Sequence, residues 1–241
     1  MNTVIVLGAS GATGNHVVNQ LLQKKVHVKI IIRPTSYIPE AWINNKQLEI
    51  IRTDFLKLSN KEIQTLVKDC NAIVSCLGHN ITFKGIYGQP RKLVRDTIKH
   101  FYNALISNKP SKPVKYVLMN SSGVHRKDLK ESISLAQKMV LGLLRLFLPP
   151  HVDNEQSAAF LNKAIGQNNK YIQWVAVRPD GLINEDEITT YEAHPSPTRS
   201  AIFNAGKISR INVAHFMVEL ITNDDLWDKW KGKMPVLYDK P

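Results

Sequence analysis

The sequence predicts one α/β domain: a doubly wound, mainly parallel sheet with helices on both faces. Short runs of aliphatic and β-branched residues alternate with longer segments of helical period, which is the pattern of successive βαβ units. Several of these runs are almost continuously apolar, as in strands that are covered on both faces. With 241 residues, 43% of them hydrophobic, the chain can form one sizeable core. We expect a single domain over residues 1–241, in which residues from about 180 to 241 form an extension on the substrate side.

The first βα unit has the clearest pattern. Thr3–Leu7 is a short β-branched run and predicts the first strand. Ala12–Gln23 follows it with apolar side chains that recur on one face, which predicts a helix. Val26–Ile32 is nearly all apolar and predicts a second strand that is buried on both faces.

The middle of the chain continues this alternation. Further strands are predicted over Leu48–Ile51, Ala72–Cys76 and Val114–Met119. Helical segments lie between them, a short one over Lys61–Val67 and a long one over Pro90–Ile106. We therefore expect these strands to lie in one parallel sheet.

The segment between the fifth and sixth strands is unusually long. An apolar helix is predicted over Ile133–Phe147, and Pro149-Pro150 ends it because proline lacks the amide donor and clashes with the preceding turn. Asp153 is expected to cap a second helix, from about Asn154 to Ile165. An apolar stripe on the first helix is interpreted as core, as a contact between two copies, or as a lid over the substrate pocket. The stripe consists of Met139, Val140, Leu143, Leu144 and Phe147.

The last part of the chain is less regular. Ile172–Val177 predicts a sixth strand, and the period is lost beyond Pro179. His194-Pro195-Ser196-Pro197 marks a loop. Ile211–Thr222 then predicts a helix, and Pro235–Tyr238 predicts a last short strand.

Composition narrows the class of partner. The formal net charge of +12 favours a dinucleotide, a phosphorylated substrate, nucleic acid or an acidic membrane. The basic residues form no continuous run, so the chain lacks a basic tail, and because charge alone supports nucleic acid we do not expect it as the main partner. Cys70 and Cys76 are predicted to be buried thiols in a reducing compartment. Without a basic leader or an apolar run of about 20 residues, we expect a cytoplasmic protein without a membrane partner. The eight histidines lack ligand spacing, so no metal site is expected.

A glycine-rich turn gives the strongest functional signal. It lies between the first strand and the first helix, where Gly8, Gly11 and Gly14 are each three residues apart. Glycines let the backbone approach a pyrophosphate, and the helix N-terminus offers amide groups and the positive end of its dipole. The context predicts a Rossmann-type dinucleotide site rather than an ordinary βα turn. Its expected binding residues are Gly8, Ser10, Gly11, Ala12, Thr13 and Gly14.

The residue at the end of the second strand indicates whether NADP(H) or NAD(H) is bound. An acidic residue there would accept hydrogen bonds from the ribose hydroxyls of NAD(H). This chain has Arg33 instead, whose guanidinium suits a 2′-phosphate and can stack on adenine. We expect NADP(H), with NAD(H) as the alternative and a plain surface arginine as the simpler interpretation.

With these residues, the chain resembles the atypical short-chain dehydrogenases/reductases of the NAD(P)H-binding group, which includes NmrA-like proteins and proteins assigned as NADH-flavin reductases. The resemblance extends from Thr3 to about Arg178. It implies that Asp54-Phe55 lies at the adenine and that Ser75-Cys76-Leu77-Gly78 lies along the ribose on the adenine side. It also implies that Ser121-Ser122-Gly123 lies near the nicotinamide.

One departure from that group concerns the catalytic Tyr-x-x-x-Lys pair, in which the lysine lowers the pKa of the proton-donating tyrosine. No tyrosine here has a lysine four residues later, and the stretch where the pair would fall reads His151-Val152-Asp153-Asn154-Glu155. We expect Ser122, His151 and Asp153 to be catalytic. A turn serine, a loop histidine and a helix-capping aspartate are the plainer interpretations. Weaker candidates are Asn154, His79 and Asp180.

Two functions remain open from the sequence. The first is an NAD(P)H-dependent reductase, which would pass hydride to a flavin, a quinone or another easily reduced small molecule. The second is a regulatory protein of NmrA-like type that binds NADP(H) without turnover. A homodimer is compatible with either function.

Overall fold

The strands form one large sheet and one small sheet. The computed structural model describes residues 3–79, 82–126, 129, 131 and 133–240. The strands are β1 (Thr3–Leu7), β2 (His27–Ile32), β3 (Leu48–Arg52), β4 (Ala72–Ser75), β5 (Val114–Met119), β6 (Ile172–Pro179), β7 (Gly181–Ile183), β8 (Tyr191–His194), β9 (Lys207–Ser209) and β10 (Val236–Asp239). Within these described residues, eight strands form a sheet in the order β3-β2-β1-β4-β5-β6-β10-β8, and β7 pairs with β9. Every neighbouring pair of the large sheet is parallel except β10 and β8.

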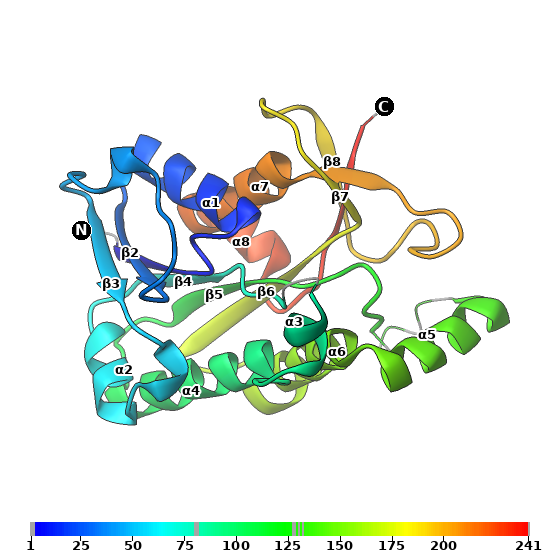
Figure 1. The fold of residues 1–241 in the computed structure, drawn as a ribbon, viewed down its shortest axis with the longest axis horizontal. Helices are drawn as coiled ribbons and strands as arrows, with labels where there is room; N and C mark the ends of the chain where they lie inside the picture. The colour runs from blue at the N-terminus through cyan, green and yellow to red at the C-terminus, as the bar shows by residue number, and fades with distance from the viewer. Residues whose placement is uncertain (1–2, 80–81, 127–128, 130, 132, 241) are drawn as a thin grey trace.

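The helices lie on both faces of the large sheet, as predicted (Figure 1). They are α1 (Ala12–Gln23), α2 (Asn60–Leu66), α3 (Phe83–Tyr87), α4 (Leu93–Asn108), α5 (Leu135–Phe147), α6 (Pro149–Phe160), α7 (Arg210–Thr222) and α8 (Asp224–Trp230). One face is covered by α1, α7 and α8, and the other by α2, α4 and α6. A single turn of π-helix, Leu161–Ile165, extends α6.

The two faces have separate cores because successive strand residues point to opposite sides. In β1, Val4 and Val6 pack under α1 and α7, whereas Ile5 and Leu7 pack under α2 and α4. All four side chains are fully buried. This explains why the strand is continuously apolar in sequence.

The strand order reverses at the centre of the sheet, between β1 and β4. The chain winds outward from β1 to β3 and then crosses back to β4, which pairs with the other edge of β1. Ligands of open α/β sheets bind at the carboxyl ends of the strands where the order reverses. The turn that contains Gly8, Gly11 and Gly14 lies there, after β1.

The segment between β5 and β6 differs from the prediction. Pro149 and Pro150 end α5 as expected, but they also occupy the first positions of α6, where no amide donor is needed. Asp153 therefore lies inside α6 and does not cap it, so the predicted N-cap was wrong. The long helix predicted from Pro90 begins at Leu93, as α4.

The apolar stripe of α5 is not part of the core. Only Gln137 and Leu141 of this helix are buried, whereas Met139, Leu143 and Phe147 are exposed. Beyond Pro179, the segment predicted to be irregular contains the short strands β7, β8 and β9. Helix α8, with its N-cap Asn223, was also not predicted.

Candidate functional site

The glycines of the turn after β1 are required by close backbone contacts. Gly8 has a φ of 75°, and a β-carbon on it would lie 2.7 Å from the carbonyl oxygen of Cys76. A β-carbon on Gly14 would overlap the carbonyl oxygen of Gly8. Side chains at these positions would push the turn, α1 and the end of β4 apart. Packing of this kind is what a dinucleotide fold needs from its first and third glycines.

The N-terminus of α1 is open to an anion. The first amide groups of a helix have no carbonyl partner within it. Gly11 is the N-cap and supplies no side chain, and the first turn contains no acidic residue. Ser10, Gly11 and Ala12 are exposed, so the turn faces outward, while Thr13 is buried beneath it. The cradle fits a diphosphate, which the amide groups and the helix dipole would stabilise.

The loop after β2 brings basic and hydroxyl groups to the same edge. Arg33 is exposed, and its guanidinium has no partner among the described residues. Arg52, at the end of β3, donates hydrogen bonds to the carbonyls of Pro34 (3.2 Å) and Ser36 (3.0 Å). The hydroxyl of Ser10 lies 3.4 Å from that of Ser36, which joins this loop to the glycine turn.

The residues expected at the adenine and its ribose differ in their exposure and in their hydrogen bonds. The Asp54 carboxylate accepts a hydrogen bond from the Leu56 amide and caps the short helical turn that starts at the buried Phe55. Cys76 is buried, and burial raises the pKa of its thiol to about 12, so it stays protonated. Leu77 is half-buried and Gly78 is exposed beside open space.

The two serines after β5 have different surroundings. The buried hydroxyl of Ser122 donates to Oδ1 of Asp180 at 2.9 Å, and the Gly206 amide donates to the other oxygen of Asp180 at 2.8 Å. Ser121 Oγ accepts the amide of Gly123 at 3.2 Å. A β-carbon on Gly123 would lie 3.5 Å from Ser121 Oγ and 3.8 Å from the His151 ring, so these two groups are neighbours.

His151 and Glu155 lie one turn apart on α6. Nε2 of His151 lies 3.5 Å from Oε1 of Glu155, a distance of an ion pair, and this nitrogen is buried without a hydrogen-bond partner among the described residues. Arg145 of α5 donates three hydrogen bonds to the Glu155 carboxylate, at 2.7 to 3.1 Å. Burial would raise the pKa of Glu155, but the interactions with His151 and Arg145 outweigh it and lower that pKa to about 2. Glu155 is therefore ionised near neutral pH and places a negative charge beside the His151 ring.

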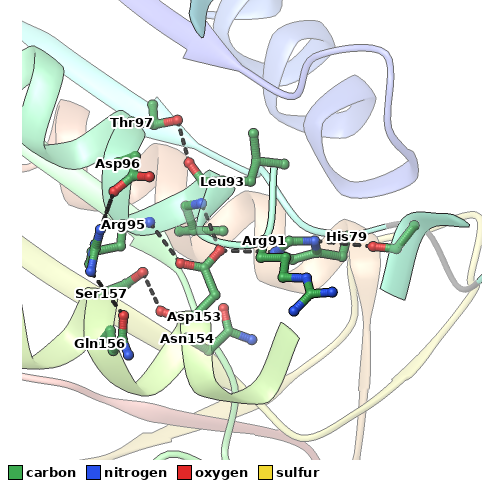
Figure 2. Close-up of polar contacts among 12 residues, drawn as sticks. His79, Arg91, Leu93, Arg95, Asp96, Thr97, Asp153, Asn154, Gln156 and Ser157 are labelled. Atoms are coloured by element: carbon green, nitrogen blue, oxygen red, sulfur yellow. Dashed lines mark hydrogen bonds and ion pairs between the residues drawn. The ribbon is translucent and has the colours of Figure 1, made fainter. Parts of the chain in front are cut away.

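Asp153 joins three segments of the chain through polar contacts (Figure 2). Its buried carboxylate accepts the amides of Val94 (2.8 Å) and Arg95 (3.0 Å), and so caps α4 from another helix. Nε2 of His79 lies 2.9 Å from the same carboxylate, and Nδ1 lies 3.2 Å from the Gly85 carbonyl.

Asn154, one of the weaker candidates, and Arg178, at the end of β6, both form contacts within the protein. The backbone carbonyl of Asn154 accepts a hydrogen bond from the Asn120 side chain at 3.1 Å. Arg178 is fully buried and donates to Glu131 at 3.0 and 2.8 Å. A cavity of about 320 Å³ opens beside α6; it adjoins Glu155 and Arg145, but its lining contains no residue of the glycine turn.

Sequence reasoning missed three contributors to this region: Arg52, Arg145 and Glu155. The spacing of His151 and Glu155 was visible, since positions four apart share a helix face. Arg145 comes from the preceding helix, and Arg52 from the strand beyond β2, so only the fold brings them in. Among the residues that the structure describes, no cluster has the ligands for a metal, and no helix is long and apolar enough to span a bilayer.

Comparisons with known proteins agree with this geometry. The chain matches the NAD(P)H-binding family over residues 8–224. An uncharacterized chloroplastic protein of Arabidopsis thaliana is 26% identical over 222 residues, which are 92% of this chain and 72% of that protein.

Solved structures share the fold at low sequence identity. A short-chain dehydrogenase/reductase from Veillonella parvula in complex with NADP superposes with a TM-score of 0.70 at 16% identity, covering 99% of this chain and 94% of that one. A protein from Streptococcus pneumoniae assigned as an NADH-flavin reductase gives 0.67 at 15% identity, covering 100% of both chains. At these identities the likeness establishes the Rossmann-type fold.

Proposed function

The chain belongs to the NAD(P)H-binding family, and from that premise we propose that it is an NADPH-preferring reductase of a small, easily reduced acceptor such as a flavin or a quinone. The observation that carries the proposal is the cradle after β1, in which Gly8 and Gly14 leave no room for a β-carbon. When bound, the dihydronicotinamide supplies the hydride. The protein supplies binding, orientation and a proton.

The binding groups lie along the carboxyl edge of the sheet. Amides at the N-terminus of α1 would hold the diphosphate, with the Ser10 hydroxyl beside them. Asp54 and Phe55 would border the adenine, and Cys76, Leu77 and Gly78 would lie along the ribose next to it. A protonated thiol at Cys76 adds no charge there, which suits contact with a neutral sugar.

Preference for NADPH rests on the charge at the ends of β2 and β3. Arg33 is free to turn toward a 2′-phosphate, and Arg52 holds the loop that carries it. The four residues from Arg33 to Ser36 include no acid that would accept the ribose hydroxyls of NADH. Two guanidinium groups at one edge favour a dianionic phosphate.

We assign the proton to His151, which begins the stretch where the family resemblance would place the missing pair. Glu155, four residues later, is a carboxylate that lies 3.5 Å from Nε2 of this imidazole. Reduction of a quinone or flavin takes up a proton with the hydride, so a positioned imidazolium accelerates it. The Ser121 hydroxyl and the His151 ring both border Gly123, whereas Ser122 and Asp153, also proposed as catalytic from sequence, would position the loops around the reacting atoms.

A regulatory protein that binds NADP(H) without turnover is the second candidate. One observation favours it: the polar side-chain groups of Ser122 and Asp153 already form hydrogen bonds within the protein. In that case the His151–Glu155 pair would have no substrate to protonate.

The assay of acceptor-dependent NADPH oxidation separates the two. Purified protein is mixed with NADPH and a panel of flavins and quinones in the absence of oxygen, and the loss of reduced-nicotinamide absorbance is corrected for the rate without protein. The proposed reductase gives saturable turnover with at least one acceptor, and His151→Gln lowers it while NADPH still binds. Tight NADPH binding without turnover on any acceptor would support the regulatory protein.

A further inference from the structure

Helix α5 exposes an apolar surface at one end of the molecule. Met139, Leu143 and Phe147 are 65%, 55% and 62% exposed. Leu135 and Leu146 extend this surface and are exposed further still. Figure 1 shows α5 projecting from the body of the protein beyond the start of α6. A patch of this kind on a globular protein marks an interaction site.

The apolar surface continues onto α3. The Tyr87 hydroxyl donates to the carbonyl of Phe147 at 2.9 Å, which attaches α3 to the end of α5. Phe83 is 82% exposed, and its ring centroid lies 5.0 Å from that of Tyr87. We call the surface formed by α3 and α5 the α3–α5 surface.

In the two segments that form the α3–α5 surface, every charged residue is basic. Residues 82–92 and 133–150 contain no aspartate or glutamate. Lys138, Arg91 and Lys92 are exposed, and the Lys138 ammonium has no partner among the described residues. Arg145 is neutralised by Glu155 and does not add to this field. The formal net charge of +12 strengthens the positive electrostatic field at this surface.

From this combination we propose that the α3–α5 surface docks on a lipid bilayer with anionic headgroups. A helix with exposed aliphatic and aromatic side chains and flanking basic residues lies in the plane of such a membrane, with its apolar face below the headgroups. A second copy of this chain is a poorer occupant, because face-to-face pairing would bring the two sets of basic residues together. The proposal goes beyond the proposed reductase activity and differs from the expectation of no membrane partner, which rested on the lack of a spanning segment.

Vesicle flotation tests the proposal without cofactor or acceptor. The full chain is mixed with vesicles of phosphatidylcholine alone, or with about one third phosphatidylglycerol. The protein should float with the anionic vesicles, stay behind with the neutral ones, and be released by about 0.5 M salt. Leu143→Glu and, separately, Phe147→Glu should lower the partition coefficient about tenfold or more, because each places a carboxylate in the apolar face.

Matched controls keep the result interpretable. Ile43→Glu changes a 60%-exposed aliphatic residue elsewhere and should leave binding unchanged. Unchanged thermal melting would show that each variant is folded. Absence of flotation with anionic vesicles overturns the proposal, as does flotation that Leu143→Glu and Phe147→Glu leave intact. The surface would instead be assigned to a second copy if sedimentation equilibrium showed a dimer, if Leu143→Glu dissociated that dimer, and if the natural chain did not bind vesicles.

Discussion

Nε2 of His79 lies 2.9 Å from Oδ2 of Asp153, although the two residues are 74 positions apart. The same carboxylate accepts the amides of Val94 and Arg95 at the start of α4. One buried acid thus fixes the exit of β4, the start of α4 and the first turns of α6. A defect at Asp153 would therefore loosen three segments that follow or adjoin the carboxyl ends of the strands.

Asp153→Asn should therefore act mainly on stability. The amide keeps one acceptor for the α4 cap but loses the charge that favours a donating His79 ring. We expect a loss of about 1–3 kcal/mol in the free energy of unfolding, as for a damaged cap with a buried charge-assisted hydrogen bond. Urea unfolding measures it, with the exposed Asp228→Asn as the control. A fully stable variant with abolished turnover would instead make Asp153 a catalytic residue.

A second prediction concerns acid and the buried pair of Glu131 and Arg178. Burial would raise the pKa of Glu131, but His125 and the hydrogen bonds from Arg178 lower it from 4.5 to about 2. A lowered folded-state pKa contributes stability that is complete above the ordinary pKa and is lost as pH falls toward the folded one. The free energy of unfolding should therefore fall between pH 4.5 and about 2.

Glu131→Gln tests this directly. Near neutral pH it should cost about 3–5 kcal/mol, because the Arg178 charge stays buried without its partner. The difference from the natural chain should shrink as pH approaches 2. Glu49→Gln, in an exposed pair with Lys29, should change stability by less than about 1 kcal/mol. Equal stability of Glu131→Gln and the natural chain at neutral pH would show that the pair contributes nothing.

The third prediction concerns cofactor choice. Arg33→Ala should weaken NADPH by about tenfold to a hundredfold, since a charged hydrogen bond contributes about 1.5–3 kcal/mol. NADH lacks the 2′-phosphate and should be affected little. Calorimetric titration of both cofactors measures this, with Arg199→Ala as a control at the opposite end of the sheet. Equal weakening of NADPH and NADH would remove the 2′-phosphate assignment.

The fourth prediction concerns the proton donor. His151→Gln should lower kcat with a quinone by about a hundredfold or more, as for loss of a general acid. Glu155→Gln should lower it less, because the imidazole remains. The dissociation constant for NADPH should stay within about twofold in both variants, since neither residue borders the diphosphate. His194→Gln, whose ring lies 3.0 Å from Glu192 on β8, is the matched control. Unchanged kcat in His151→Gln would contradict the assignment.

Local pattern was sufficient to predict the parallel strands of the large sheet and the glycine turn. Val4 to Leu7 are buried on alternating faces. A strand that is buried on both faces consists of a continuous run of apolar residues, and this run is visible in the sequence. The contacts of Gly8 and Gly14 likewise follow from a strand, a tight turn and a helix in succession. Family resemblance added the expected adenine and nicotinamide segments.

The polar connections could not be predicted because they join distant segments. Asp153 follows two prolines and a leucine-rich helix, so the sequence predicted it as the cap of its own helix. In the structure its carboxylate accepts hydrogen bonds from two amides that lie 58 and 59 positions away. The apolar period of α5 predicted a buried face equally well as an exposed one, because periodicity does not say what covers it.

The most direct test of the central claim is calorimetric titration of NADPH into the natural chain, Gly14→Ala and Gly142→Ala. In Gly14→Ala the new methyl group would overlap the Gly8 carbonyl, whereas a methyl group on Gly142 of α5 meets nothing within 4 Å. We predict saturable binding of one NADPH to the natural chain and to Gly142→Ala, and loss of that binding in Gly14→Ala. No heat from NADPH or NADH with the folded natural chain would contradict a diphosphate cradle after β1.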